Sequence, residues 1–339
     1  MAQQTSTTLP SGSSNHIKNV AIVGASGTSG KHIVEALLAT GKHNITAITR
    51  EGGTTPMPSG ISVQKVDYSN PSTLVSALRN QDALIITMGV RAPPDQQTKL
   101  IHAAAEAGVQ WILPNEFGYD SSNEALCNDI MPGGQKQGYT SHIENLGVSK
   151  WIGFVCGFWY TFSLGGSPDR FGFDFPNRKV ILFDEGTQPI SVTTFPLVGK
   201  GVANLLSLPI TKSDDEKSTT ACLSDFGNRF CYVASFVVSQ KDMLDSVLRV
   251  TKTDVKEWTI TKEGTKERYE RGMTRLRGGD YAGLVLGMYS RNFFPDGSGN
   301  HSVTRGLDNE KLGLPKEDLD EFTEVAIKEA LSGTSDSYH

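Results

Sequence analysis

The sequence predicts an α/β protein built on a Rossmann-type doubly wound parallel sheet, with a smaller α/β domain after it. An apolar strand at residues 20–23 runs into a glycine-rich turn and then into a helix. Strands and helices continue to alternate up to about residue 155. The expected strands are continuously apolar, as in parallel sheets that are covered by helices on both faces.

The first strand–turn–helix unit carries the most specific signal. The strand is followed by Gly24, Ala25, Ser26, Gly27, Thr28, Ser29 and Gly30, and then by a helix over 31–39. Glycines let the backbone approach a pyrophosphate, and the helix start offers it N–H groups and partial positive charge. We therefore expect dinucleotide binding by Gly24, Ser26, Gly27, Thr28, Ser29 and Gly30. The alternative, a tight turn between a buried strand and its helix, leaves the third glycine unexplained.

The next units follow the same rhythm. Strands are expected over 45–49, 61–66, 83–87 and 109–113, and helices over 71–78, 96–107 and 137–146. Ser69 or Asn70 is the expected cap of the helix over 71–78, whereas Gly108 and Gly147 end the two later helices. Ligands of such sheets bind beyond the carboxyl ends of the strands, so Thr87 and Gly89 are expected cofactor contacts.

After residue 156 the alternation becomes irregular and aromatic residues are frequent. Strands are expected over 180–183, 230–238 and 258–261, helices over 196–206, 241–250 and 318–331, and a solvated loop over 211–220. We expect a disordered tail over 1–15, an NAD(P)-binding Rossmann domain over 16–155 and a substrate-binding domain over 156–335. The segment 190–206 can fold back onto the first sheet, so the two domains are expected to be partly interleaved.

Composition excludes several classes of protein. A net charge of −5 over 339 residues provides no basic field for nucleic acid or an anionic membrane. The four cysteines form no CxxC pair and do not cluster with histidines, so neither a disulfide framework nor a metal site is expected. Residues 1–15 lack the basic start and apolar core of a targeting peptide, and the apolar run 151–164 is too short to span a bilayer. We expect a cytoplasmic protein.

The end of the second strand indicates which nicotinamide cofactor is bound. An acidic residue at this position binds the ribose hydroxyl of NAD, but here the residue is Arg50, whose guanidinium suits the 2′-phosphate of NADP. A solvated arginine beside Glu51 is the alternative. Asp67, which ends the third strand, is a candidate for the adenine edge of the cofactor and equally a candidate for capping its own loop.

The usual catalytic pair of short-chain dehydrogenases is absent. No lysine stands four residues after Tyr68, Tyr119, Tyr139, Tyr160 or Tyr269. A Gly-x-Ser-x-Gly elbow of a serine hydrolase is absent as well.

A different resemblance begins at the fifth strand, where the chain reads Trp111-Ile112-Leu113-Pro114-Asn115-Glu116-Phe117-Gly118. This segment resembles the Pro-Ser-Glu-Phe-Gly box of the isoflavone reductase and phenylcoumaran benzylic ether reductase group, within the NmrA-like atypical short-chain dehydrogenases. The glycine loop and the arginine after the second strand are shared with that family too. The resemblance covers about the first 165 residues and implies NADPH as cofactor, with Asn115 and Phe117 among the residues that bind it.

The resemblance also implies a catalytic residue. In the family a lysine stands eleven positions before a helix-ending glycine, and Lys136 precedes Gly147 by that spacing, with Ile143 and Glu144 in matching places. Lys136 is then expected to contact the nicotinamide and to act as the general acid/base while hydride is delivered. From the residues alone, a lysine between two glycines is an ordinary exposed side chain.

The chain also departs from the family pattern. Asn115 replaces the serine of the box, and the loop over 51–58 has no clear second basic residue for the 2′-phosphate. The loop over 120–134 differs from the plant proteins, so the identity of their substrates does not carry over.

Aromatic side chains are the candidates for substrate contacts. Phe158, Trp159 and Tyr160 either line a pocket for a flat substrate or belong to the core of the second domain. Consecutive residues of a strand cannot all face one way, so about half of them are expected at a pocket. Tyr139 is a further candidate, three residues after Lys136, whereas His142 is expected on the helix surface.

These observations favour a cytosolic NADPH-dependent reductase whose substrate is a small aromatic or conjugated molecule, of the kind found in secondary metabolism. The alternative is an NmrA-like regulator that binds the dinucleotide without turning it over and acts through a protein partner. Such regulators lack the catalytic lysine, and Lys136 is in register here.

Overall fold

A computed structural model describes residues 14–89, 92–130, 137–212 and 221–333. Its largest sheet has seven strands in the order β11-β6-β5-β4-β1-β2-β3, and every neighbouring pair is parallel. The strands are β1 (Asn19–Val23), β2 (Asn44–Arg50), β3 (Ser62–Val66), β4 (Ala83–Ile86), β5 (Trp111–Leu113), β6 (Lys150–Val155) and β11 (Arg229–Tyr232). The strand order runs from β1 through β2 to β3 on one side, and from β4 outward on the other side of β1. This reversal at the neighbouring strands β1 and β4 confirms the doubly wound Rossmann-type fold.

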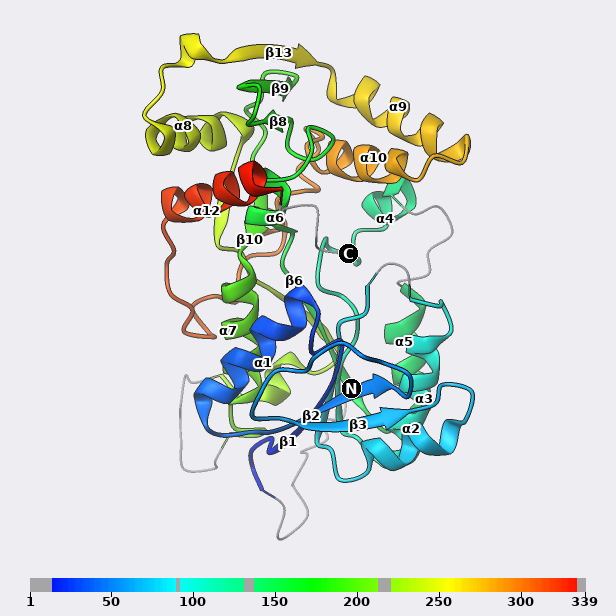
Figure 1. Cartoon of the computed structure of the whole chain (residues 1–339). Helices are drawn as coiled ribbons and strands as arrows, with labels where there is room; N and C mark the ends of the chain where they lie inside the picture. The colour runs from blue at the N-terminus through cyan, green and yellow to red at the C-terminus, as the bar shows by residue number, and fades with distance from the viewer. Residues whose placement is uncertain (1–13, 90–91, 131–136, 213–220, 334–339) are drawn as a thin grey trace, which may run out of the picture.

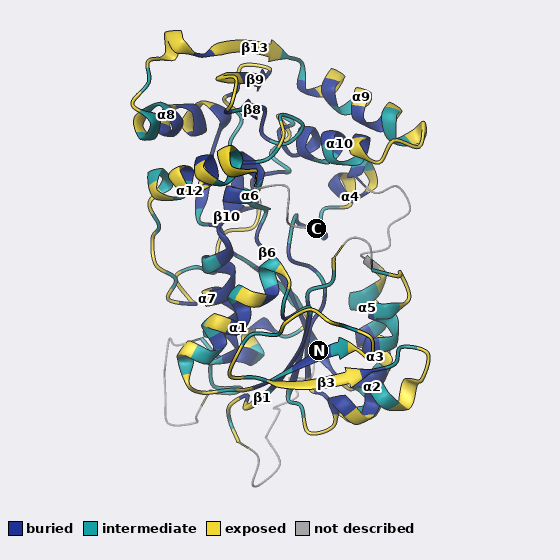
Figure 2. Cartoon of the chain, viewed as in Figure 1, coloured by how far each residue is buried: buried dark blue, intermediate teal, exposed yellow. Residues whose placement is uncertain are grey.

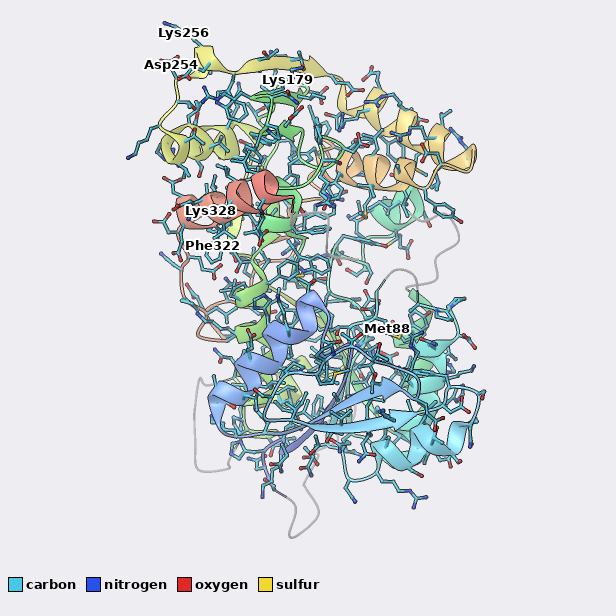
Figure 3. All side chains as sticks on the ribbon, in the orientation of Figure 1. Met88, Lys179, Asp254, Lys256, Phe322 and Lys328 are labelled. Carbon is cyan, nitrogen blue, oxygen red and sulfur yellow. The ribbon has the colours of Figure 1, made fainter. Side chains whose placement is uncertain are left out.

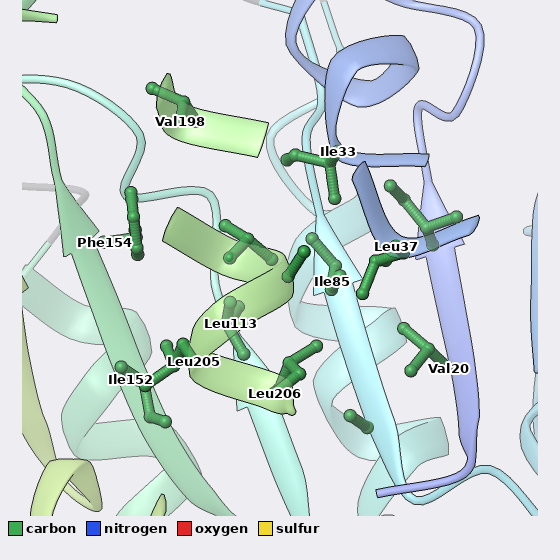
Figure 4. Packing of buried hydrophobic residues seen from close by; sticks show 14 of the residues in the cluster. Val20, Ile33, Leu37, Ile85, Leu113, Ile152, Phe154, Val198, Leu205 and Leu206 are labelled. Atoms are coloured by element: carbon green, nitrogen blue, oxygen red, sulfur yellow. The ribbon is translucent and has the colours of Figure 1, made fainter. Parts of the chain in front are cut away.

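Helices cover both faces of this sheet. One face packs against α1 (Thr28–Thr40) and α7 (Phe195–Leu206), and the other against α2 (Pro71–Leu78), α3 (Gln96–Ala107) and α5 (Gln137–Leu146). Figure 4 shows Ile33 and Leu37 of α1 and Leu205 and Leu206 of α7 against Val20, Ile85 and Leu113 of the strands. Alternate strand residues point to opposite faces, so Ala21, Val23, Leu84 and Ile86 belong to the second cluster.

The α1–α7 contact is unusually close because of one glycine. A Cβ at Gly199 of α7 would lie 2.3 Å from the carbonyl oxygen of His32 in α1. The absence of a side chain at this position lets the two helix backbones touch, as Figure 1 shows for the pair beside the sheet. The segment after residue 190 therefore returns to the first sheet.

The second half of the chain forms two small sheets with helices around them (Figure 1). One sheet contains β7 (Phe158–Trp159), β10 (Ile190–Thr193) and β12 (Phe236–Val238), and the other β8 (Phe173–Asp174), β9 (Lys179–Phe183) and β13 (Thr259–Glu263). The helices are α4 (Glu124–Ile130), α6 (Tyr160–Leu164), α8 (Gln240–Thr251), α9 (Thr265–Arg277), α10 (Ala282–Asn292), α11 (His301–Thr304) and α12 (Leu319–Ser332). Short 3-10 turns occupy Leu223–Phe226 and Val255–Glu257.

Several expected elements agree with the structure and one does not. The helices over 71–78, 96–107 and 137–146 have the expected bounds, and Asn70 is the N-cap residue of α2. The single strand expected over 230–238 is wrong, because its first part joins β6 as β11 and its last part joins β10 as β12. The strand β3 is the exposed edge of the large sheet (Figure 2), with only Val66 buried. Most of the expected loop over 211–220 lies outside the described residues.

Candidate functional site

The candidate site lies at the carboxyl edge of the large sheet, where β1 and β4 are neighbours. The glycine-rich turn leaves β1 here, and Thr87 follows β4 directly. The Thr87 amide and hydroxyl both donate to the Val23 carbonyl, at 3.0 and 2.9 Å. Met88, labelled in Figure 3, comes next along this edge. Parallel sheets with this strand order bind ligands at the crossover point.

Two of the three glycines are required by the backbone. Gly24 has a φ of +85°, and a Cβ there would lie 2.1 Å from the carbonyl oxygen of Thr87. A Cβ at Gly30 would lie 2.0 Å from the carbonyl oxygen of Gly24. Gly24 thus brings the turn against the end of β4, and Gly30 brings α1 against the turn. The third glycine, which a simple tight turn leaves unexplained, is required for this helix–turn packing.

The start of α1 is left open for an anion. Gly27 is its N-cap residue and supplies no side-chain hydrogen bond to the first turn. Gly27 is exposed, whereas Ser26, Thr28 and Ser29 are half-buried. The first amides of a helix have no partner within the helix, and the helix dipole adds positive character there. This turn therefore has the features of a diphosphate cradle, with Ser26, Thr28 and Ser29 as hydroxyl donors beside it.

The ends of β2 and β3 place Arg50 and Asp67. Arg50 ends β2, its side chain is exposed, and it makes no ion pair with any described residue, Glu51 included. Burial raises the pKa of Tyr68, and the positive charge of Arg50 partly opposes this effect, so the two side chains are close. Asp67 accepts hydrogen bonds from the amide and hydroxyl of Ser69, at 2.8 and 2.7 Å. These bonds lower the pKa of Asp67, first through the Ser69 hydroxyl and then through its amide.

A buried amide lies next to the end of β4 and was not found from the sequence. Gln97, in the first turn of α3, is 2% exposed and accepts a hydrogen bond from the Asn115 amide at 3.0 Å. Its Nε2 is buried without a hydrogen-bond partner among the described residues. The Asn115 side chain donates to the carbonyl oxygen of Met88 at 3.0 Å. Asn115 therefore ties the start of α3 and the segment after β4 to the loop after β5, beside the exposed Gly89.

The box after β5 is mostly internal. Glu116 is 1% exposed and accepts a hydrogen bond from the Ser121 hydroxyl at 2.6 Å. The ring of Phe117 is 8% exposed and packs against Phe154, with ring centroids 5.7 Å apart. The structure thus places the Phe117 side chain in the core below the loop. A contact of Phe117 with a cofactor stays a prediction, and only its backbone is suited to it.

Tyr139 lies on α5 near the same edge. Its hydroxyl donates to the Pro94 carbonyl at 3.2 Å, just ahead of α3. Burial, and then the negative charge of Glu116, raise the pKa of Tyr139. Tyr139 is therefore half-buried, with its hydroxyl at the segment that precedes α3. Lys136, the expected acid/base residue, lies outside the described residues, one position before α5 begins.

The three consecutive aromatic residues separate into different environments. Phe158 stacks on Tyr289 with ring centroids 4.0 Å apart, inside the second core. Tyr160 is fully buried and its hydroxyl bonds to that of Thr323 at 2.7 Å. The pocket expectation for Tyr160 is corrected, because a ring without any exposed surface cannot line a pocket.

Trp159 lies on the side of the glycine-rich turn. Its ring packs on Phe195 with centroids 5.0 Å apart, and Phe195 stacks on His32, one turn into α1, at 5.8 Å. The Trp159 Nε1 is buried and has no hydrogen-bond partner among the described residues. Burial lowers the pKa of His32, so this imidazole is mainly neutral. Trp159 is thus the aromatic side chain of the three with an unused donor.

Other site classes find no support in the described structure. No three or more histidine, cysteine, aspartate or glutamate side chains come together as a metal site within the ranges 14–89, 92–130, 137–212 and 221–333. The same ranges contain no helix that is both long and apolar enough to cross a membrane. All four cysteines lie within the described residues, where they are buried and form no disulfide.

Comparisons with known proteins agree with this arrangement. Residues 16–164 match the model of the NmrA-like family. The chain is 29% identical to the oxidoreductase aprR of Aspergillus flavus over 315 aligned residues, and this alignment covers 91% of this chain and 98% of that protein. A crystal structure of isoflavone reductase shares the fold, with a TM-score of 0.70 and 18% identity over 91% of this chain and 98% of that one. The structure described as AtPrR2 with NADP+ and (+)pinoresinol has a TM-score of 0.68 and 19% identity, over 92% and 99% of the two chains.

Proposed function

We propose that this chain, whose residues 16–164 match the model of the NmrA-like family, is an NADPH-dependent reductase of a small aromatic or conjugated molecule. The observation that carries the proposal is the glycine turn at the β1–β4 crossover. There the backbone of Gly24 and Gly30 is packed as closely as a diphosphate cradle requires. The similarity to oxidoreductases of comparable length supports an enzymatic role.

The residues present fit NADP(H). The start of α1 suits the pyrophosphate, and the exposed guanidinium of Arg50 at the end of β2 suits a 2′-phosphate through its paired N–H donors. We assign the buried Nε2 of Gln97 and the side chain of Asn115, which lie at the carboxyl edge of the sheet after β4 and β5, to the nicotinamide end of the cofactor. When bound, the cofactor supplies the hydride, and the protein supplies position and proton transfer.

Lys136 is the proposed acid/base residue. It precedes α5 directly, and α5 carries Tyr139, whose hydroxyl donates to the Pro94 carbonyl just ahead of α3. A lysine here would exchange a proton with the substrate atom next to the carbon that receives hydride. Trp159, whose indole N–H is buried without a partner among the described residues, is the proposed donor toward the substrate, from the core that α1 and α7 form with the large sheet.

The proposal is tested first by binding. Titration of the full chain with NADPH and with NADH, followed through energy transfer from its four tryptophans, is expected to show clear preference for NADPH. Equal affinity for both would contradict the assignment of Arg50. Tight NADPH binding without turnover on any conjugated aromatic compound would favour the alternative, a dinucleotide-binding regulator that acts through a protein partner.

The role of Lys136 is tested by turnover. With a substrate found by screening conjugated aromatics for NADPH oxidation, Lys136→Ala is expected to lower kcat by at least about 100-fold, because general acid–base catalysis contributes roughly 10²–10⁴-fold. NADPH affinity is expected to change by less than about twofold, since the 2′-phosphate and pyrophosphate contacts remain. The matched control is Lys42→Ala, an exposed lysine after α1. Unchanged kcat in Lys136→Ala would remove the proton role.

A further inference from the structure

Two histidines from neighbouring helices meet outside the candidate cofactor site. His102 lies on α3 and His142 on α5, and their Nε2 atoms are 3.1 Å apart. The two rings lie nearly perpendicular, with an interplanar angle of 72° and a centroid distance of 4.6 Å. His142 was expected on the helix surface, and the structure adds the contact with a second imidazole.

The sequence of each helix places these side chains at the solvent boundary. In α3 the buried residues Leu100, Ile101, Ala103 and Ala104 face the sheet, which leaves His102 exposed. In α5 the neighbouring Ile143 is buried at 1% exposure, which leaves His142 at the edge of the α3–α5 contact. An ion from solvent can therefore reach both Nε2 atoms without disturbing the core.

The distance between the two nitrogens fits a shared metal ion. Nitrogen ligands of zinc lie about 2.0–2.1 Å from the metal, so two of them 3.1 Å apart subtend an angle of about 98° at the ion. This value falls between the roughly 90° of a square-planar site and the roughly 109° of a tetrahedral one. Both side chains lie at the solvent boundary, so their rings can rotate to aim both lone pairs at one point. In the present contact a single N–H must be shared between two nitrogens, and a cation would take the place of that proton.

We propose that His102 and His142 form a two-histidine site for a divalent transition-metal ion, with water completing the coordination. Imidazole nitrogens favour copper, nickel and zinc over magnesium and calcium. No third histidine, cysteine or carboxylate joins the pair among the described residues, so the site is an exchangeable one and not a buried structural centre. The order of affinity follows from the ligand type: Cu²⁺ binds more tightly than Zn²⁺, and Mg²⁺ does not bind.

The site has a structural consequence for the protein. A metal held by both side chains ties α5 to α3, and α5 begins one residue after Lys136. The pair shares no residue with the glycine turn, Arg50 or Gln97. Metal binding can therefore be tested separately from the proposed cofactor function. Metal binding also stabilises the folded chain, because the two histidines are close together only in the folded state and the metal therefore binds that state in preference to the unfolded one.

The experiment is calorimetric titration of the EDTA-treated full chain with CuCl2, ZnCl2 and MgCl2. The variants are His102→Gln and His142→Gln, and the control is His16→Gln, an exposed histidine far from the pair in sequence. Glutamine keeps a polar side chain of similar reach, and Tm without metal checks that each variant is folded. One Cu²⁺ per chain is expected in the wild type, with affinity at least about tenfold weaker in each single variant and unchanged in the control.

A spectroscopic readout separates ligation from general stability. The Cu²⁺-loaded wild type is expected to give nitrogen hyperfine coupling from two imidazoles in its electron paramagnetic resonance spectrum, and each variant coupling from fewer. Wild-type affinity and an unchanged spectrum in both His102→Gln and His142→Gln would overturn the proposal. Tightest binding of Mg²⁺ would overturn it as well, because that preference belongs to oxygen ligands.

Discussion

Replacing Arg50 by glutamine removes the positive charge that the proposed function assigns to the 2′-phosphate. In the structure this guanidinium is exposed at the end of β2 and forms no ion pair with a described residue. Its loss therefore breaks no contact that the fold depends on, and Tm is expected to stay within the small range of surface substitutions. Any large change in cofactor affinity is then due to the lost contact between Arg50 and the cofactor and not to a change in the fold.

The expected magnitude follows from the kind of contact. A hydrogen bond to a charged partner contributes about 1.5–3 kcal/mol, which corresponds to roughly a 10- to 150-fold change in affinity. Arg50→Gln is thus expected to weaken NADPH binding by roughly 10- to 150-fold and NADH binding by less than about twofold, since NADH has no 2′-phosphate. The lower end of this range is favoured because the side chain is solvated.

The assay is fluorescence titration of wild type, Arg50→Gln and Arg79→Gln with both cofactors, at two salt concentrations. Arg79 is an exposed arginine at the end of α2 and serves as the matched charge control. The difference between NADPH and NADH is expected to shrink at high salt in the wild type, because an exposed charge contact is screened. Equal losses for the two cofactors in Arg50→Gln, or the same loss in Arg79→Gln, would refute the reasoning.

Two further substitutions test the cradle and the acid stability of the fold. Gly30→Ala places a Cβ only 2.0 Å from the carbonyl oxygen of Gly24. We therefore expect the free energy of unfolding to fall by about 1–3 kcal/mol, measured by urea denaturation, and the binding of both cofactors to weaken, measured by titration. Gly52→Ala, whose Cβ would meet nothing within 4 Å, should leave both unchanged. Burial raises the pKa of Asp308, but hydrogen bonds from Lys311, a backbone amide and an arginine outweigh burial and leave the pKa lowered. The stabilisation is therefore present above the unfolded value of 3.8 and is lost as the pH falls through the lower folded value, so Asp308→Asn should cost about 1–2 kcal/mol at pH 7 and progressively less as the pH falls below 3.8.

Local signals in the first half of the chain were sufficient to predict α1, α2, α3 and α5, although not α4. Pro71 at the start of α2, and Gly108 and Gly147 with φ values of +81° and +69° after α3 and α5, fix the helix ends within a few residues. The glycine turn was predicted for the same reason, since its chemistry is contained in seven consecutive residues. Contacts between distant segments were not predicted. Gln97 and Asn115 are eighteen positions apart, and no sequence pattern around either residue indicates that they form a hydrogen bond.

The second half was predicted only in part: α7, α8, α12, β9 and β13 lie close to their expected bounds, whereas other elements depend on packing with segments distant in sequence. The apolar run over 230–238 serves two sheets, with the Val233 amide bonded to Val155 of β6 and the Ser235 amide to Val192 of β10. The helix α9 was not predicted because it is mostly charged. It packs on α10 through Gly272, where a Cβ would lie 2.5 Å from the Gly287 amide nitrogen. Backbone contact replaces the apolar stripe that periodicity would detect.

The aromatic run shows how hydrogen-bonding capacity decides which side chain remains available to a ligand. Phe158 and Trp159 are half-buried whereas Tyr160 has no exposed surface, so burial excludes Tyr160 but does not separate the other two. The hydroxyl of Tyr160 is already satisfied by Thr323, and Phe158 has no polar atom to satisfy. Buried polar groups are almost always paired, and the indole N–H of Trp159 is not paired with any described residue. Its ring packs on the core that α1 and α7 form with the large sheet and connects through Phe195 to His32 of α1, so a ligand that accepts from Trp159 would lie on the same side as the glycine turn.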